Sequence, residues 1–262
     1  MTVNNMTKNK TKLIVANWKM NPGSGEEARM IAMNIGKKAR VFGNAKLVVC
    51  PPFMFLDEVA SVLEASKKVS LGAQDVFIGK GVSHTGEISL DMLKKAGVKY
   101  VIIGHSERRG SLDSDEVVKE KLLGVLKGNL KAILCVGEKE RNEHGDHFHE
   151  VKRQLESAIS KLPKKFIKNL VLAYEPVWAI GKSEKEAMKP EQLHEMAIFI
   201  KRFLNDVFGA RSAENAKILY GGSVTKNNAK DIVEKGNVQG LLVGRESLKT
   251  ENFVELIREI GN

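Results

Sequence analysis

The stretch Ala132-Ile133-Leu134-Cys135-Val136 is the clearest sign of the fold in this sequence. It is short and continuously apolar, which is typical of a β-strand buried on both faces, as in a parallel sheet covered by helices. Segments of the same character recur along the whole chain, at residues 13–16, 47–50, 69–73, 100–103, 170–173, 218–220 and 241–243. The chain is therefore expected to contain about eight buried parallel strands.

Longer amphipathic segments separate these strands. Ala28, Ile31, Ala32 and Ile35 follow the spacing i, i+3, i+4 and i+7 of one helix face. Eight strand–helix units in roughly 250 residues predict a single-domain α/β fold, the (β/α)8 barrel, over residues 12–262. A doubly wound sheet is the rival, but it usually has a Gly-rich first turn, which is absent after residues 13–16.

Composition restricts the kind of protein. The chain has 262 residues, 42% of them hydrophobic, which excludes disorder as its main state. Its net charge is +10, and residues 1–11 are expected to form a flexible basic tail. Aromatic residues make up only 6%, and no motif interleaves them with bases, so we expect no nucleic-acid partner.

The sequence also bears on location. No apolar run approaches the roughly 20 residues that cross a bilayer, and residues 1–12 lack the apolar centre of a secretory signal. Two cysteines do not suggest a disulfide framework. We therefore expect a cytoplasmic protein without a membrane partner.

Functional residues of a parallel barrel lie where the strands end. The predicted strand ends carry Asn17-Trp18-Lys19, Gly104-His105-Ser106, Tyr174-Glu175-Pro176, Gly221-Gly222-Ser223 and Gly244-Arg245. Taken alone, Glu175 could belong to a structural ion pair, His105 could be a packed core histidine, and Lys19 could be a solvated lysine. Together they supply a base, a hydrogen-bond donor and a cation.

Two of these strand ends are rich in glycine. The main-chain N–H groups of Gly221-Gly222-Ser223 and Gly244 can approach a phosphate closely, and the last two loops of a barrel are a frequent phosphate site. With the base at Glu175, this pattern predicts proton abstraction next to the carbonyl of a small phosphorylated substrate.

The same segments resemble the triosephosphate isomerase family from Lys12 to the end of the chain. The resemblance rests on the order and spacing of Asn17-Trp18-Lys19, Thr85-Gly86-Glu87, the 104–109, 135–138 and 173–181 segments, Tyr220-Gly221-Gly222-Ser223-Val224 and Leu242-Val243-Gly244. It implies a TIM barrel that interconverts dihydroxyacetone phosphate and glyceraldehyde 3-phosphate in glycolysis and gluconeogenesis. No metal or organic cofactor is implied.

The resemblance also implies roles for individual residues. Glu175 would be the base, His105 a neutral electrophile, Asn17 its assistant, and Lys19 the cation that stabilises the enediolate. Phosphate would meet the main chain of Gly181, Ser223, Gly244 and Arg245. Supporting roles would fall to Ser106, which holds Glu175 at rest, to Ile180 and Leu242, which cover it, and to the lid-hinge pair Glu138 and Trp178.

A homodimer is implied as well. Residues 74–87 resemble the long loop that reaches into a neighbouring subunit, with Gln74, Asp75 and Thr85 at the interface. Residues 176–187 resemble the lid that closes over the substrate.

The chain departs from the family pattern in a few places. Arg245 replaces a second glycine, residues 182–187 replace a small, threonine- and glycine-rich lid tip, and Ser83-His84 and Asp75 change the dimer loop. An outward-turned Arg245 would leave phosphate binding unchanged, and an inward one would add a contact. For the whole protein, two functions stay open beside triosephosphate isomerase activity. One is an isomerase of a related sugar phosphate, and the other is a catalytically weakened sugar-phosphate-binding paralogue.

Two further features have competing explanations. His144, His147 and His149 could hold a metal, but their spacing favours a solvated loop. Cys135 could be a nucleophile, but it has no base beside it in sequence and is expected to pack beneath the site.

Overall fold

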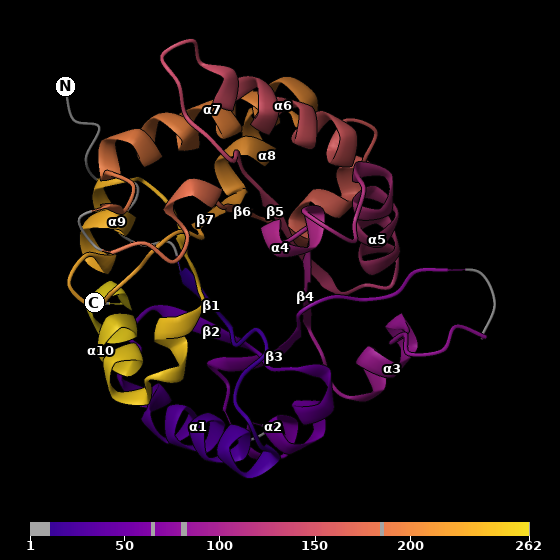
Figure 1. Ribbon diagram of the computed structural model, residues 1–262, viewed down its shortest axis with the longest axis vertical. Helices are drawn as coiled ribbons and strands as arrows, with labels where there is room; N and C mark the ends of the chain where they lie inside the picture. The colour runs from indigo at the N-terminus through magenta and orange to yellow at the C-terminus, as the bar shows by residue number, and fades with distance from the viewer. Residues whose placement is uncertain (1–10, 64–65, 80–82, 184–185, 262) are drawn as a thin grey trace.

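The computed structural model describes residues 11–63, 66–79, 83–183 and 186–261. Its parallel strands close into a barrel in chain order, so the predicted (β/α)8 barrel is confirmed (Figure 1). The strands are β1 Lys12–Asn17, β2 Ala45–Cys50, β3 Val69–Ala73, β4 Tyr100–Ile103, β5 Lys131–Val136, β6 Leu170–Tyr174, β7 Lys217–Tyr220 and β8 Gly240–Val243.

The α-helices form a ring outside the barrel (Figure 1). They are α1 Gly25–Lys38, α2 Leu56–Leu63, α3 Leu90–Lys95, α4 Ser106–Arg109, α5 Asp115–Lys127, α6 Asp146–Ile159, α7 Pro190–Phe208, α8 Ala210–Asn215, α9 Ala229–Lys235 and α10 Thr250–Gly261. Short 3-10 helices complete the connections: η1 Ala39–Val41, η2 Phe53–Phe55, η3 Lys164–Asn169, η4 Val177–Ala179 and η6 Arg245–Leu248.

The continuous apolarity of the strands has a direct structural cause. In β1, Leu13 and Val15 belong to the cluster that fills the barrel interior, whereas Ile14 and Ala16 belong to the cluster between sheet and helices. Successive side chains of a strand point to opposite faces, and both faces are buried here. Every position of the strand must therefore be apolar, and polar and apolar residues do not alternate along it.

One glycine in the barrel wall is required by packing. A Cβ added to Gly72 in β3 would lie 2.5 Å from Sγ of Cys50 and 2.7 Å from Cγ1 of Val48. These distances are shorter than real side-chain contacts allow, so glycine lets β2 side chains fill this part of the interior.

Helix α1 has the predicted buried face and a polar cap at its start. Ser24 caps α1 by accepting the N–H of Glu27, and the buried residues of this helix are Ala28, Ile31, Ala32 and Ile35, the predicted stripe. None of the described helices is both long and apolar enough to cross a membrane.

The interpretation of residues 144–149 as a solvated loop is wrong in part. Gly145, at φ 80°, ends the loop, and α6 begins at Asp146, so His147 and His149 are helical. His147 is buried and packs its ring against Phe148, with 4.2 Å between the ring centres. Burial lowers the pKa of His147, which disfavours a charged ring there. His144 and His149 remain exposed.

The predicted flexible tail falls on residues 1–11, of which only Thr11 is among the described residues. Parts of two predicted loops, residues 80–82 of the dimer loop and residues 184–185 of the lid, also lie outside the described residues.

Candidate active site

A cavity of about 810 Å³ opens at the carboxyl ends of the strands. Its wall contains the predicted catalytic and phosphate-binding residues and the two residues expected to cover the base, namely Asn17, Lys19, His105, Glu175, Ile180, Gly181, Ser223, Leu242, Gly244 and Arg245. They come from the last residues of β1 and β8 and from the loops after β1, β4, β6, β7 and β8. The barrel therefore collects at one place side chains that are far apart in the chain.

Glu175 and His105 form the centre of this site. Both are buried, with 2% and 6% of their surfaces exposed, and Nε2 of His105 lies 3.2 Å from Oε1 of Glu175. The structure thus brings a carboxylate and an imidazole together at the cavity wall, which is the arrangement needed for proton transfer between them and a substrate.

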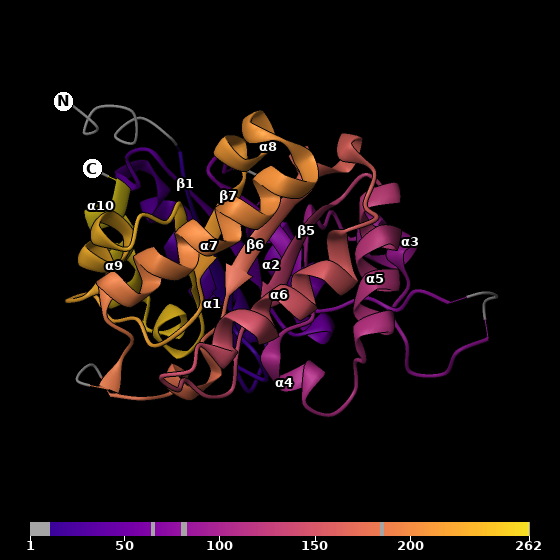
Figure 2. The ribbon, with the colours of Figure 1, turned by 90° about the horizontal axis from the view of Figure 1, so that it is seen from above.

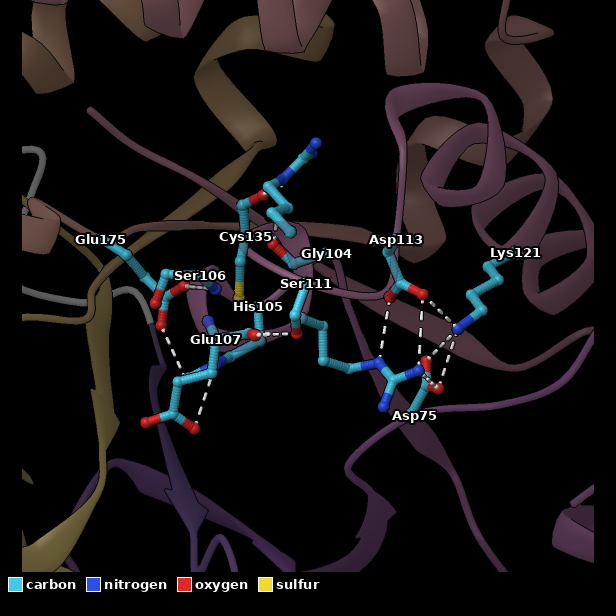
Figure 3. A network of polar contacts seen from close by, with 12 residues as sticks. Asp75, Gly104, His105, Ser106, Glu107, Ser111, Asp113, Lys121, Cys135 and Glu175 are labelled. Atoms are coloured by element: carbon cyan, nitrogen blue, oxygen red, sulfur yellow. Dashed lines mark hydrogen bonds and ion pairs between the residues drawn. The ribbon is translucent and has the colours of Figure 1, made fainter. Parts of the chain in front are cut away.

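The start of α4 orients both groups. The main-chain N–H of Ser106 donates to Oε2 of Glu175 over 3.0 Å, and the N–H of Glu107 donates to Nδ1 of His105 over 3.2 Å (Figure 3). Because Nδ1 accepts a hydrogen bond, the neutral ring carries its proton on Nε2, the atom that faces Glu175. Ser106 reaches Glu175 through its main chain.

Lys19 is held in an unusual backbone conformation, with φ at 52°. Its N–H donates to Oδ1 of Asn17 over 3.0 Å, and its carbonyl accepts from Nε2 of Gln74 over 2.8 Å. A non-glycine residue at positive φ costs free energy, and these two contacts help to maintain it. The predicted interface residue Gln74 therefore has a role within its own chain.

The ammonium of Lys19 lies 2.6 Å from Oε1 of Glu107. Partial burial alone would raise the pKa of Glu107, but the hydrogen bond and charge of Lys19 outweigh it and hold that pKa below its ordinary value. Glu107 thus stays ionised and keeps the cation at the cavity wall.

Two glycines make room for Glu175. A Cβ on Gly221 would lie 2.8 Å from Cγ of Glu175, and a Cβ on Gly137 would lie 1.8 Å from its carbonyl oxygen. Both distances are prohibitive, so the conformation of the carboxylate depends on the absence of these two side chains.

The cavity end expected to bind phosphate is formed by the loops after β7 and β8. The N–H of Ser223 donates to the Ala179 carbonyl over 3.2 Å, and its hydroxyl donates to the Lys182 carbonyl over 3.0 Å. Ser223 is therefore joined to the lid in this structure. η6 begins directly after Gly244, so its first N–H groups lie at this end of the cavity.

Arg245 lies at the mouth of the same cavity. A Cβ placed on Gly181 would be 3.9 Å from Nη2 of Arg245, so the guanidinium reaches across the cavity toward the lid. This geometry favours the inward alternative, in which the side chain adds a phosphate contact.

Glu138 organises the base of the lid. Its Oε1 accepts hydrogen bonds from Nε1 of Trp178 and from the Tyr174 hydroxyl, each over 2.8 Å. Glu138 is 1% exposed, so these contacts are shielded from water. The predicted pair of Glu138 and Trp178 is thus in contact where η4 begins the lid.

A network of four charged groups lies beside α4, and the sequence analysis missed it (Figure 3). Lys121 contacts Asp75 and Asp113 at 2.8 and 2.9 Å, and Arg108 contacts the same two carboxylates at 2.8 and 3.0 Å. Lys121 falls between Val118 and Leu122 on the buried face of α5, and a lysine within an apolar stripe was the available signal.

The two carboxylates of this network differ in their electrostatics. Burial raises the pKa of Asp113, but the hydrogen bonds and charges of Arg108 and Lys121 outweigh it and hold the pKa below its ordinary value. At Asp75 burial dominates over the same two cations and raises the pKa. The network therefore stabilises the ionised form of Asp113 more than the ionised form of Asp75.

Thr85 lies apart from the cavity. It is exposed on the loop between β3 and α3, which extends away from the barrel (Figure 1). Asp75 has its ion-pair partners within this chain, so the fold itself accounts for its position. Contact of Gln74, Asp75 and Thr85 with a second subunit stays a prediction.

Cys135 lies beneath Glu175 at the end of β5 and is fully buried. Burial and the neighbouring Glu175 raise the pKa of the Cys135 thiol well above its ordinary value, which keeps it protonated. The structure therefore favours the expected packing beneath the site over the nucleophile alternative. Within the described ranges, no group of three His, Cys, Asp or Glu side chains could hold a metal ion.

The model of the triosephosphate isomerase family matches residues 12–260. The chain belongs to the triosephosphate isomerase family. It is 38% identical over 253 residues to the triosephosphate isomerase of Flavobacterium psychrophilum, covering 96% of this chain and 100% of that protein. The enzymes of Idiomarina loihiensis and Dehalococcoides mccartyi are 38% and 39% identical over 246 and 249 residues, covering 93% and 94% of this chain and 96% and 95% of theirs.

Membership of the triosephosphate isomerase family agrees with the contents of the cavity. An isomerase of this kind needs a carboxylate, a donor for the carbonyl oxygen and a cation close together, and these are the groups at the carboxyl ends of the strands.

Proposed function

We propose that this chain interconverts dihydroxyacetone phosphate and D-glyceraldehyde 3-phosphate, with Glu175 as the base. The observation that carries the proposal is the buried pair of Glu175 and His105, 3.2 Å apart, on the wall of a cavity that also contains Lys19. The family match over residues 12–260 supports the same reaction.

Glu175 removes a proton from the carbon next to the carbonyl and returns it to the neighbouring carbon. It is nearly inaccessible to water, so few water molecules solvate the carboxylate. The Ser106 N–H holds it at rest, so movement toward substrate exchanges this hydrogen bond for the substrate proton.

His105 donates its Nε2 proton to the carbonyl oxygen as negative charge develops there. The hydrogen bond from the Glu107 N–H to Nδ1 maintains the tautomer that can do this. Asn17 is buried, and its Oδ1 is occupied by the Lys19 N–H, so its amide group remains the donor that assists His105.

Lys19 supplies the positive charge that offsets the enediolate and the phosphate. Its ion pair with Glu107 and its backbone contacts keep it at the cavity wall before substrate arrives. Preorganised charge of this kind stabilises the transition state without a reorganisation cost during the reaction.

The phosphate binds between the lid and the loops after β7 and β8. Gly181, Ser223, Gly244 and Arg245 line this end of the cavity. The hydrogen bonds from Ser223 to the lid would be exchanged for phosphate contacts when substrate binds. Ile180 and Leu242 line the same cavity and would exclude water from the base.

The protein acts as a homodimer in this proposal. The exposed Thr85 loop extends away from its own barrel, which suits a loop that buttresses the site of a second copy (Figure 1). Residues 1–11 are proposed to be a tail outside the barrel domain.

A coupled assay with glyceraldehyde 3-phosphate tests the reaction. The parent protein should turn over, and Glu175→Gln, which keeps the size of the side chain, should lose about a hundredfold to ten-thousandfold in kcat. Glu116→Gln, an exposed carboxylate on α5, is the matched control and should keep full activity. A parent without turnover, or an active Glu175→Gln, would refute the proposal.

A further inference from the structure

A second cavity, of about 640 Å³, lies at the amino ends of the strands. It is at the opposite end of the barrel from the active site: Figure 2 shows α8, which contributes to its wall, across the barrel from α4. None of the described residues that line it also lines the catalytic cavity. The two cavities are therefore separate.

The wall of this cavity is strongly basic. Four strands each contribute a lysine where the chain enters the barrel: Lys12, Lys131 and Lys217 are first residues of their strands, and Lys46 is the second residue of β2. Lys164 and Lys168 of η3 and Arg211 of α8 add three more cations. Among the described residues of the wall, not one is Asp or Glu.

Several of these cations form no ion pair. Within the part of the chain that the structure describes, five of them, Lys12, Lys46, Lys164, Lys168 and Arg211, form no ion pair. In contrast, Lys38 and Lys235 on the outer helices are paired. Burial lowers the pKa of Lys12, and the charge of Glu234 opposes this only in part. Like charges that share a concave wall repel one another and concentrate a positive field inside it.

The remaining wall mixes apolar residues with uncharged polar ones and contains one aromatic ring. Leu13, Leu170 and Val171 lie at the starts of their strands, and Tyr100 is beside them. Nζ of Lys131 is 3.2 Å from the Tyr100 hydroxyl and 4.9 Å from the centre of its ring. A wall that combines cations with uncharged polar and apolar groups suits a ligand that has an organic body and anionic groups.

We propose that this basic cavity binds a small organic polyanion of the nucleoside-phosphate class. Its phosphates contact Lys131, Arg211 and the neighbouring lysines, because guanidinium and ammonium groups suit phosphate oxygens. Its organic body lies against the uncharged part of the wall between these cations. The volume is within the roughly 300–1,000 Å³ of small-ligand sites, which favours a single small molecule over the extended groove that a nucleic-acid strand requires.

Binding of ATP, measured by isothermal titration calorimetry at low and moderate salt, tests this proposal. The parent protein should bind ATP, with inorganic pyrophosphate binding more weakly and adenosine weakest. In Lys131→Gln with Arg211→Gln, ATP affinity should fall by about tenfold or more, because two charge-assisted contacts are lost.

The controls distinguish a loss of binding at this cavity from effects of net charge, misfolding or binding at the active site. Lys119→Gln with Lys230→Gln removes the same charge from exposed positions on α5 and α9 and should bind ATP as the parent does. Lys131→Arg with Arg211→Lys keeps both charges and should retain binding. Isomerase activity should be unchanged in all of these variants.

Several results would overturn the proposal. One is a parent that does not bind ATP; another is an affinity that Lys131→Gln with Arg211→Gln leaves unchanged. Competitive inhibition of the isomerase reaction by ATP would assign the nucleotide to the catalytic cavity. Displacement of ATP by a short single-stranded oligonucleotide but not by pyrophosphate would indicate a nucleic-acid surface instead.

Discussion

The main-chain N–H of Ser106 donates a hydrogen bond to Oε2 of Glu175 over 3.0 Å. The carboxylate proposed as the base after β6 is therefore held by the first residue of α4, which follows β4. At the same time its Oε1 faces Nε2 of His105 at 3.2 Å. The position of Glu175 is thus set by residues that follow another strand, β4. Small changes in the space around Glu175 should therefore change the rate of proton transfer.

Gly221→Ala tests this dependence on space. The added Cβ would lie 2.8 Å from Cγ of Glu175, so the carboxylate must shift. We expect kcat to fall by about tenfold to a hundredfold, because proton transfer depends steeply on geometry, and KM to change little. Steady-state kinetics with glyceraldehyde 3-phosphate measure both quantities.

Gly23→Ala is the matched control for this substitution. A Cβ at Gly23 meets no atom within 4 Å, so the variant should behave as the parent. Equal kcat values for Gly221→Ala and the parent would show that the Glu175 position tolerates the added methyl group.

Arg245→Met tests whether the guanidinium contacts phosphate. Its Nη2 lies 3.9 Å from the Cβ position of Gly181, at the cavity end expected to hold the phosphate. We expect KM to rise by about tenfold at low salt, the loss of one charge-assisted contact. The difference in KM between the variant and the parent should become smaller at higher salt, because salt screens the charge of the guanidinium.

Lys249→Met removes a charge from the same cavity rim and serves as the control. Lys249 is paired with Glu246 at 3.1 Å, so its loss should change KM less. If Arg245→Met and the parent share the same KM at every salt concentration, the side chain has no part in phosphate binding.

Asp113→Asn tests the charge network beside α4. The pKa of Asp113 is below its ordinary value in the folded protein because Arg108 and Lys121 outweigh the effect of burial. Its ionised form therefore stabilises the fold above the unfolded pKa of about 3.9, and this stabilisation is lost as pH falls through the folded pKa. At pH 7 the variant should lose about 2 kcal/mol of unfolding free energy.

Urea denaturation between neutral and acidic pH measures this effect. The difference between Asp113→Asn and the parent should shrink as the pH drops below about 4, where the carboxyl takes up a proton in the unfolded state. Asp75→Asn is the comparison: burial raises the pKa of Asp75, so its charge contributes less and its loss should cost less. Equal losses for the two variants, or a loss that persists at the lowest pH, would contradict this account.

The proposed dimer is tested by sedimentation velocity across a range of protein concentrations. A self-associating species should dissociate on dilution, and activity per chain should fall with it if Thr85 buttresses a partner site. Thr85→Asp places a charge on the exposed loop and should shift the equilibrium toward monomer. A monomer with full activity at assay concentration would refute the interface.

Much of the fold followed from local patterns in the chain. The segment at 132–136 and its counterparts became β1 to β8, because strands buried on both faces must be apolar at every position. The catalytic candidates could be named for the same reason: once the strands are parallel, Asn17, His105 and Glu175 all follow a carboxyl end and must meet at one edge.

Other features arise only when distant segments pack together. Nothing near Glu175 in the chain indicates that the Ser106 N–H holds it, and nothing near Lys121 names Asp75 and Asp113 as its partners. His147 was misplaced because its burial depends on how α6 packs after the turn at Gly145. The basic cavity likewise exists because barrel closure gathers the first residues of separate strands, and the repulsion among their charges is a property of that shared space.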